Sequence, residues 1–257
     1  MPVFTRNGIE LFYEDIGEGR PLLLLHGLTS NSAMFYHEIE FFKNERRVIA
    51  MDSRGHGNSS RLNQYTLQDH IDDAIALLSY LELDTIDVLG VSMGSYIAQG
   101  VAVQNSEKVK KLILVATKSY GEQSSMAELF DRYPNKFDGL SMLEKFSMSS
   151  SYIYHNQNRI DEWLSKTAQN SRQLNMKEQA IAADALKEFD FRQQHLQIAA
   201  ETLVISGKFD GLNPPEKGRE TAVSIPDATF MEFKRSGHAP NVEQPDLFLG
   251  IVENFLE

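Results

Sequence analysis

Short apolar runs alternate with amphipathic stretches along most of this 257-residue chain, and that alternation limits the fold more than any other feature. The apolar runs are continuous rather than alternating in polarity, which is typical of parallel strands that helices cover on both faces. Strands that alternate with helices build βαβ units. We therefore expect an α/β fold with a mostly parallel, doubly wound sheet. The runs are PLLLL (21–25), RVIAMD (47–52), IDVLG (86–90), KLILVA (111–116), TLVIS (202–206) and ATFMEF (228–233).

The stretches between these runs have the period of an amphipathic helix. In the longest of them, over 67–83, apolar side chains recur on one stripe. Thr66 and Asp69 stand where an N-terminal capping pair would stand. Further helices are predicted over 94–104, 215–223 and 245–256.

The interval 119–199 breaks this alternation, because it contains no convincing strand. The segments 125–133, 160–169 and 176–189 suit helices. The serine-rich segment 141–151 is interpreted as a loop or a helix end.

We predict that residues 119–199 form a helical cap inserted into a core domain made of residues 1–118 and 200–257. Ligand pockets in open α/β sheets form beyond the carboxyl ends of the strands, so this cap would roof the site. Its aromatic side chains predict an apolar lining, although for any one of them packing of the cap on the core is the simpler interpretation. The candidate pocket residues are Phe130, Tyr133 and Trp163.

A serine flanked by glycines follows one of the predicted strands. The sequence GVSMG covers Gly90 to Gly94, directly before a predicted helix. A nucleophilic serine on a strand-to-helix turn needs small residues two positions before and after it, because strand and helix cross closely there. Gly-x-Ser-x-Gly alone can occur in any glycine-rich loop. Here the predicted strand before it and the predicted helix after it make the pattern specific. Ser92 is therefore the predicted nucleophile.

A serine nucleophile needs a base, and the base needs an acid that orients it. Of the seven histidines, only His238 lies between the last predicted strand and the last predicted helix, and we predict that it is the base. Asp210 follows the strand 202–206 and is the predicted acid. The competing position for the acid follows the strand 111–116, where no carboxylate occurs before Glu122.

The oxyanion that forms in acyl transfer needs two preorganised N–H donors, and the loss of one such donor costs roughly 2.7–4 kcal/mol. Met93 directly follows the nucleophile at a helix N-terminus, so its backbone N–H is one predicted donor. The backbone N–H of Leu28, in the loop after the strand 21–25, is the other. We expect Gly27 to permit close approach there, and we interpret His26 as structural.

Composition limits the partners and cofactors. The formal net charge of −11 argues against nucleic acid or an anionic membrane, because both attract clustered Lys and Arg. The absence of cysteine excludes disulfides, a thiolate nucleophile and Cys-ligated metals, and we predict no cofactor and no metal. The N-terminal residues lack the pattern of a secretory leader, and no apolar run reaches about 18 residues. We expect a cytoplasmic protein with a small acyl substrate, and the oligomeric state stays open.

These motifs resemble the α/β-hydrolase superfamily over nearly the whole chain outside the predicted cap. The matching segments are HG at 26–27, DSRGHGNSS at 52–60, the turn around Ser92 and GHAPNVEQPD at 237–246. The resemblance implies a Ser-His-Asp triad and two backbone oxyanion donors at the positions predicted above, with His56 as a supporting residue. Within the superfamily, the motifs look most like the 3-oxoadipate enol-lactonase and small-esterase branch.

Two residues depart from patterns in the superfamily. Ser95 stands where many relatives have a second glycine, and Ala239 follows His238 where meta-cleavage C–C hydrolases often carry tryptophan. The second departure argues against a C–C hydrolase. Ser92 argues against haloalkane dehalogenases and epoxide hydrolases, which carry aspartate at the nucleophile position.

We therefore expect a metal-independent serine hydrolase that cleaves a small carboxylic ester, lactone or thioester through an acyl-enzyme on Ser92. Enol-lactone hydrolysis, C–C bond hydrolysis and cofactor-free perhydrolysis on the same triad are alternatives. A non-catalytic ligand receptor is a more distant alternative, because a fold does not fix a function.

Overall fold

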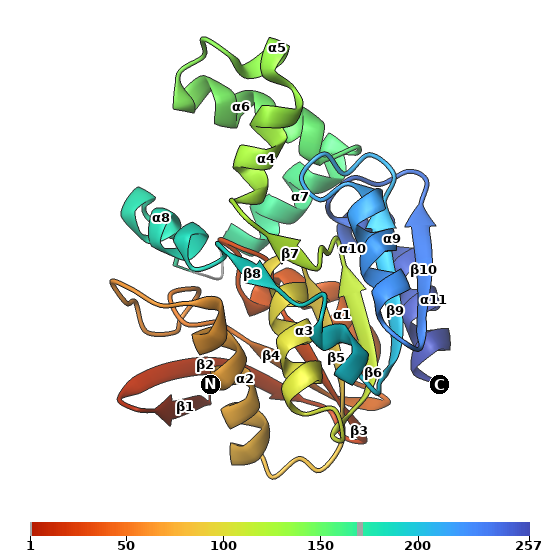
Figure 1. Cartoon of the computed structure of the whole chain (residues 1–257). Helices are drawn as coiled ribbons and strands as arrows, with labels where there is room; N and C mark the ends of the chain where they lie inside the picture. Colours follow the sequence, from red (N-terminus) through yellow and green to blue (C-terminus); the bar gives the residue numbers. More distant parts are fainter. Residues whose placement is uncertain (1, 169–171) are drawn as a thin grey trace.

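One sheet of eight strands runs through the molecule in the order β1-β2-β4-β3-β5-β6-β9-β10 (Figure 1). The computed structural model describes residues 2–168 and 172–257. The pairs β1–β2 and β2–β4 are antiparallel, and the other neighbouring pairs are parallel, which confirms the predicted α/β fold. The strands are β1 (Val3–Arg6), β2 (Ile9–Ile16), β3 (Arg20–Leu25), β4 (Arg46–Met51), β5 (Ile86–Val91), β6 (Val109–Val115), β9 (Glu201–Gly207) and β10 (Ala228–Phe233).

The continuous apolar runs form central strands because both faces of the sheet are covered. In β3, Leu23 and Leu25 pack into the core on one face, while Leu22 and Leu24 pack into the core on the other. All four side chains are buried, and full burial of one leucine contributes about 1.5–3 kcal/mol. An alternating run would have left one face of this strand polar.

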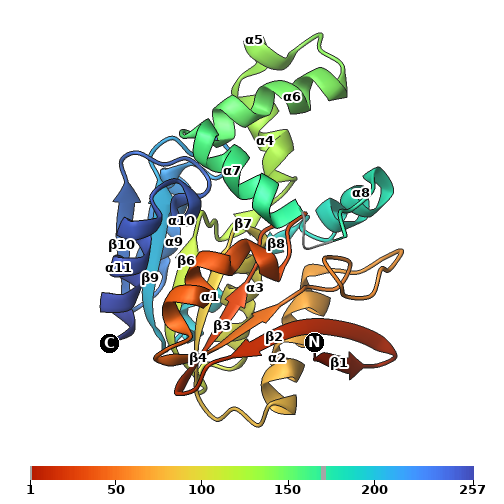
Figure 2. The same ribbon diagram turned by 180° about the vertical axis from the view of Figure 1, so that it is seen from behind.

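Helices cover the two faces of the sheet (Figures 1 and 2). Apolar side chains of α2, α3 and α9 pack into one core, and those of α1 and α11 pack into the other. The capping pair predicted at Thr66 and Asp69 is present at the start of α2. The helices are α1 (Tyr36–Phe42), α2 (Leu67–Tyr80), α3 (Met93–Gln104), α9 (Pro215–Ser224), α10 (Pro240–Glu243) and α11 (Pro245–Leu256), with 3₁₀ turns η1 (Ser32–Phe35) and η2 (Gln194–Gln197).

The segment between β6 and β9 is mostly helical and stands beyond the carboxyl ends of the strands, with α5 and α6 farthest from the sheet (Figure 1). The prediction of a loop or helix end over 141–151 is wrong, because α6 covers it. Ser141 and Glu144 form a capping box there, which starts the helix. The helices are α4 (Ser125–Arg132), α5 (Pro134–Phe137), α6 (Met142–Ile153), α7 (Gln157–Ala168) and α8 (Met176–Asp184).

Two very short strands also lie within this segment, contrary to the expectation of none. β7 (Tyr120–Gly121) and β8 (Phe189–Asp190) pair antiparallel, so the chain enters and leaves the helical segment side by side. The division into a cap over 119–199 and a core stays a prediction. Gln169, the last residue of the helix predicted over 160–169, lies outside the described residues.

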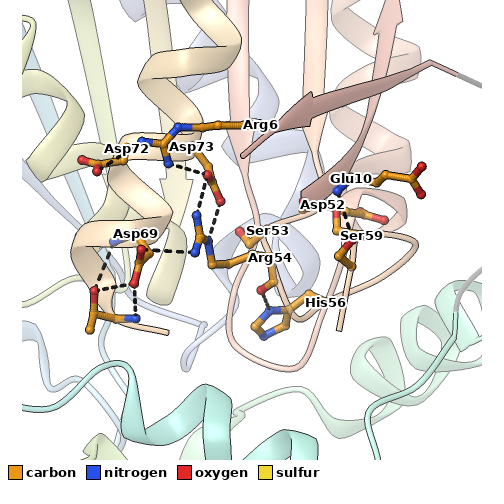
Figure 3. Close-up of polar contacts among 12 residues, drawn as sticks. Arg6, Glu10, Asp52, Ser53, Arg54, His56, Ser59, Asp69, Asp72 and Asp73 are labelled. Carbon is orange, nitrogen blue, oxygen red and sulfur yellow. Dashed lines mark hydrogen bonds and ion pairs between the residues drawn. The ribbon is translucent and has the colours of Figure 1, made fainter. Parts of the chain in front are cut away.

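A buried ion pair between Arg54 and Asp73, with the half-buried Arg6 and Asp69 beside it, holds the loop after β4 against α2 (Figure 3). The Arg54 guanidinium donates to both carboxylate oxygens of Asp73, over 2.6 and 2.7 Å. Arg6, from β1, donates to the same carboxylate over 2.9 Å, and Asp69 lies 3.2 Å from Arg54. Loss of one partner of a buried pair typically costs about 3–5 kcal/mol, so these contacts fix the loop that carries His56.

Candidate active site

Ser92 occupies a strained turn between β5 and α3. Its backbone angles are φ 52° and ψ −116°, a conformation that costs about 1–3 kcal/mol and that the surroundings must enforce. A Cβ on Gly90 would lie 2.2 Å from the carbonyl oxygen of Gly94, and a Cβ on Gly94 would lie 1.9 Å from that of Leu25. Both positions therefore require glycine, because β5 and α3 cross closely at this turn, as the sequence predicts.

The structure brings Ser92, His238 and Asp210 into one hydrogen-bonded chain. His238 Nε2 lies 2.9 Å from Ser92 Oγ, and His238 Nδ1 lies 2.8 Å from Asp210 Oδ2. An ionised carboxylate can only accept, so Nδ1 carries the proton and Nε2 is free to accept from the serine hydroxyl. Asp210 Oδ1 accepts the backbone N–H groups of Leu212 and Asn213, each over 2.9 Å, which fixes the carboxylate plane.

Solvent exposure differs along this hydrogen-bonded chain of three residues. Asp210 and His238 are buried, whereas Ser92 is half-buried. Glu122, the competing position for the acid, is exposed after β7, and no hydrogen bond joins it to His238 in the part of the chain that the structure describes.

The two predicted oxyanion donors both have a free N–H group. Met93 is the first residue of α3, and the first N–H groups of a helix have no partner within it. Leu28 lies in the turn after β3, and no acceptor for either N–H occurs among the described residues. A Cβ on Gly27 would lie 3.6 Å from Ser92 Cβ, which is an ordinary contact. Close approach to Ser92 therefore does not explain that glycine.

His26 and His56 are buried beside the site and are hydrogen-bonded to backbone groups. His26 donates from Nδ1 to the Gly27 carbonyl over 2.8 Å, and its Nε2 accepts the Ser53 N–H over 3.0 Å. Burial lowers the pKa of His26 to about 4 and that of His56 to about 3, so both rings are neutral at pH 7. His26 thus ties the loop after β3 to the loop after β4.

Ser95, where many relatives have glycine, holds the strained peptide of Ser92. Its hydroxyl donates to the Ser92 carbonyl over 2.6 Å and lies 2.8 Å from Thr117 Oγ1. Gln99 donates to the same Thr117 oxygen over 3.0 Å and accepts from His195 Nε2 over 2.7 Å. A buried polar chain therefore runs from His195 to the nucleophile turn.

Two buried residues of α10, which begins shortly after His238, have no role predicted from the sequence. Asn241 donates from Nδ2 to Glu38 Oε1 over 2.9 Å, and burial raises the pKa of Glu38 to about 7. The Glu243 carboxylate accepts backbone N–H groups on both sides of His238. Both lie within the motif GHAPNVEQPD, but no local pattern in it indicates these buried contacts.

The three candidate pocket residues occupy different surroundings. The ring centroids of Phe130 and Phe137 lie 4.8 Å apart, and those of Tyr133 and Tyr152 lie 4.9 Å apart. Both residues therefore belong to an aromatic cluster of the helical segment. Tyr133 also borders a cleft of about 560 Å³ that reaches Asp210. Trp163 is buried, and its Nε1–H donates to the Met34 carbonyl over 3.2 Å. Their role in binding substrate stays a prediction.

Neither a metal cluster nor a membrane-spanning helix is found in the described ranges 2–168 and 172–257. No group of three or more His, Asp or Glu side chains there could hold a metal ion. No helix there is both long enough and apolar enough to cross a bilayer.

Comparison with known proteins identifies relatives over almost the full chain. A family model described as "alpha/beta hydrolase fold" matches residues 20–245. The chain is 29% identical to 3-oxoadipate enol-lactonase 2 of Acinetobacter baylyi, covering 98% of this chain and 97% of that protein. It is 28% identical to 2-hydroxymuconate semialdehyde hydrolase of Pseudomonas putida, covering 94% and 89%. The solved structure of a thermophilic esterase from Thermogutta terrifontis is 28% identical, with a TM-score of 0.80 and coverage of 99% and 96%.

Proposed function

The chain belongs to the alpha/beta hydrolase fold family, and on that premise we propose that it is a serine hydrolase acting on a small carboxylic ester, lactone or thioester. The observation that carries the proposal is the chain of hydrogen bonds from Asp210 through His238 to Ser92, at 2.8 and 2.9 Å. Such a chain is the arrangement that activates a serine hydroxyl in acyl transfer.

In the proposed first step, Ser92 Oγ attacks the substrate carbonyl carbon. His238 Nε2 takes the hydroxyl proton as the Oγ–C bond forms, and Asp210 stabilises the imidazolium without taking the proton itself. The N–H groups of Leu28 and Met93 donate to the oxygen that becomes negative. His238 then returns the proton to the leaving group, and an acyl-enzyme is left on Ser92.

In the second step, water replaces the leaving group. His238 takes a proton from the water, the hydroxide attacks the acyl carbon, and the proton goes back to Ser92 Oγ as the acid leaves. The chemistry requires no metal and no cofactor. Phe130, Tyr133 and Trp163 are proposed to contribute the apolar side of the substrate site. The cleft that Tyr133 borders reaches Asp210, but neither Ser92 nor His238 lines it.

Replacement of the nucleophile tests the proposal. We expect Ser92→Ala to reduce turnover of p-nitrophenyl acetate and butyrate by at least about 10³-fold, because no other group takes the acyl chain. Ser79→Ala, at an exposed serine on α2, is the matched control and should keep wild-type turnover. A folded Ser92→Ala protein with wild-type turnover would contradict the mechanism.

Enol-lactone hydrolysis is the second candidate, and the 29% identical enol-lactonase favours it. A panel containing p-nitrophenyl esters, an enol-lactone, a meta-cleavage product, and acetate with peroxide separates ester, lactone, C–C and perhydrolysis activity. Ala239, in place of the tryptophan of many C–C hydrolases, predicts the weakest rate for the meta-cleavage product. Labelling of Ser92 by a fluorophosphonate would exclude a non-catalytic receptor.

A further inference from the structure

The C-terminal end of α6 contacts the loops of both the proposed acid and the proposed base. The carbonyl of Tyr152 accepts the N–H of Gly211, the neighbour of Asp210, over 2.9 Å. The next carbonyl, that of Ile153, accepts the N–H of His238 over 2.8 Å. The last carbonyls of a helix have no partner within the helix, so α6 ends with acceptors to offer. Here two successive ones hold the two loops side by side.

Glu243 contacts the same junction through its side chain. Its Oε2 accepts the N–H groups of His155 and Asn156, over 2.8 and 2.7 Å, at the junction between α6 and α7. Its Oε1 accepts the N–H of Gly237 over 2.8 Å and that of Ala239 over 3.4 Å. One carboxylate therefore joins the residues on both sides of His238 to the α6–α7 junction (residues 153–156).

The Glu243 carboxylate is buried and depends on these hydrogen bonds. Glu243 is 4% exposed, and among the described residues its carboxylate has no ion pair and is hydrogen-bonded to backbone N–H groups. A buried charge without hydrogen bonds is strongly unfavourable, which makes every one of these contacts matter. An amide side chain cannot replace the carboxylate, because its NH₂ group would face backbone donors.

The loop around His238 (residues 236–239) is also confined by close packing. A Cβ on Gly237 would lie 2.2 Å from the Ile153 carbonyl oxygen. A Cβ on Gly207 would lie 1.9 Å from the carbonyl oxygen of Gly237. The base loop thus lies between the end of β9 and the α6–α7 junction, and a displacement of either would move it.

We propose that Glu243 is a positioning residue that fixes His238 relative to Ser92 by holding the base loop on the α6–α7 junction. The inference rests on the proposed function, since it concerns the same histidine. It assigns α6 a task beyond covering the site, because the orientation of the base then depends on where that helix ends. A displacement of about 1 Å in reacting groups can reduce a rate by about 10²-fold, so loss of this contact is expected to reduce kcat.

Three variants test the inference on the full chain. Glu243→Gln keeps the size and removes one acceptor, Glu243→Asp keeps both acceptors on a shorter stem, and Glu253→Gln removes an exposed carboxylate on α11 as the control. We expect Glu243→Gln to reduce kcat at least about tenfold with KM within about twofold. Glu243→Asp should keep more activity than Glu243→Gln, and Glu253→Gln should be unchanged. Hydrogen exchange in Glu243→Gln should rise in both 153–156 and 236–239.

If Glu243 only filled space, kcat would follow the opposite order. Glu243→Gln would then be close to wild type and Glu243→Asp would have the lower kcat, and this result would overturn the inference. So would a folded Glu243→Gln protein with wild-type kcat. Should Glu243→Gln fail to fold, hydrogen exchange and kcat of Glu243→Asp decide together, because the shorter stem cannot reach all the N–H groups that Glu243 holds. Faster exchange in both 153–156 and 236–239 together with a reduced kcat supports the inference, and any other combination overturns it. Ser92→Ala, assayed alongside, separates the two proposals, because wild-type turnover in that variant contradicts the proposed function itself.

Discussion

The carboxyl edge of the sheet and the helical segment between β6 and β9 differ in what determines the direction of their side chains. At the edge, backbone constraints fix Ser92: two glycines are required by contacts at 2.2 and 1.9 Å, and the strained turn fixes the direction of the Cα–Cβ bond of Ser92. In the helical segment, contacts between helices decide which side of a helix is covered. On α6, Met142, Leu143 and Phe146 are all exposed. A site built on backbone geometry can therefore be predicted from the sequence, whereas the contacts made by packed helices cannot.

The largest effect on stability is expected at the crossing of β5 and α3. Gly94→Ala places a methyl group against the Leu25 carbonyl oxygen, and neither backbone can move without disturbing the sheet. We expect destabilisation of at least about 3 kcal/mol in urea unfolding. Gly250→Ala in α11 is the control, because nothing lies within 4 Å of the added methyl group, and it should stabilise by up to about 1 kcal/mol. Equal stabilities would show that the edge is not constrained as described.

The next effect concerns the buried carboxyl group beside the base loop. The pKa of Glu38 in the folded protein is raised from 4.5 to about 7 by burial, so the folded state binds its proton more tightly than the unfolded state. Its stabilising contribution is complete below about pH 4.5 and is lost as the pH rises through about 7, on the order of 3 kcal/mol in all. In Glu38→Gln, the free energy of unfolding in urea should therefore fall less between pH 5 and pH 8 than it does in the wild-type protein. Parallel pH curves for the two proteins would exclude a raised pKa.

A smaller effect is expected where the helical segment meets η1. Trp163→Phe removes the hydrogen bond to the Met34 carbonyl and leaves that buried acceptor unpaired, at a cost of about 1–2 kcal/mol in thermal unfolding. Because Trp163 is also a predicted pocket residue, we expect the ratio of kcat/KM for butyrate over acetate to change at least about threefold. An unchanged ratio would remove Trp163 from the substrate site and leave it a packing residue.

The smallest effect is expected on the outer face of α6. Leu143 is 82% exposed, so Leu143→Ser should change the free energy of unfolding by no more than about 0.5 kcal/mol and should leave kcat unchanged. A large loss of stability or activity would mean that this face is covered in solution, and the contrast between the two regions would then be overstated.

Much of the sheet and of the proposed triad could be predicted, because the local sequence patterns and the order of the motifs along the chain indicate the same fold. The continuous runs in β3, β5 and β9 identify central strands, and the positions of Asp210 and His238 follow from the loops after late strands. The start of α6 has a local signal as well, because Ser141 and Glu144 are a capping pair, but the serines that follow are more typical of a loop.

Other features have no local signal. Glu243 acts through backbone N–H groups at Gly237 and at 155–156, a contact that spans distant parts of the chain and follows no period. The same holds for the pairing of Glu38 with Asn241, because α1 and α10 meet only in the folded protein. The surroundings of Phe130 and Tyr133 depend on how helices of the same segment pack on each other, which amphipathic patterns do not specify.

Covalent trapping tests the central claim, that Ser92 is a nucleophile activated by His238, most directly. Intact mass and peptide mapping after treatment with a fluorophosphonate should show one phosphonyl group, located on Ser92, in the wild-type protein. Ser92→Ala should remain unlabelled, and His238→Ala should label far more slowly, because the hydroxyl has lost its base. An adduct on another residue, or labelling of Ser92 at the same rate without His238, would contradict the account.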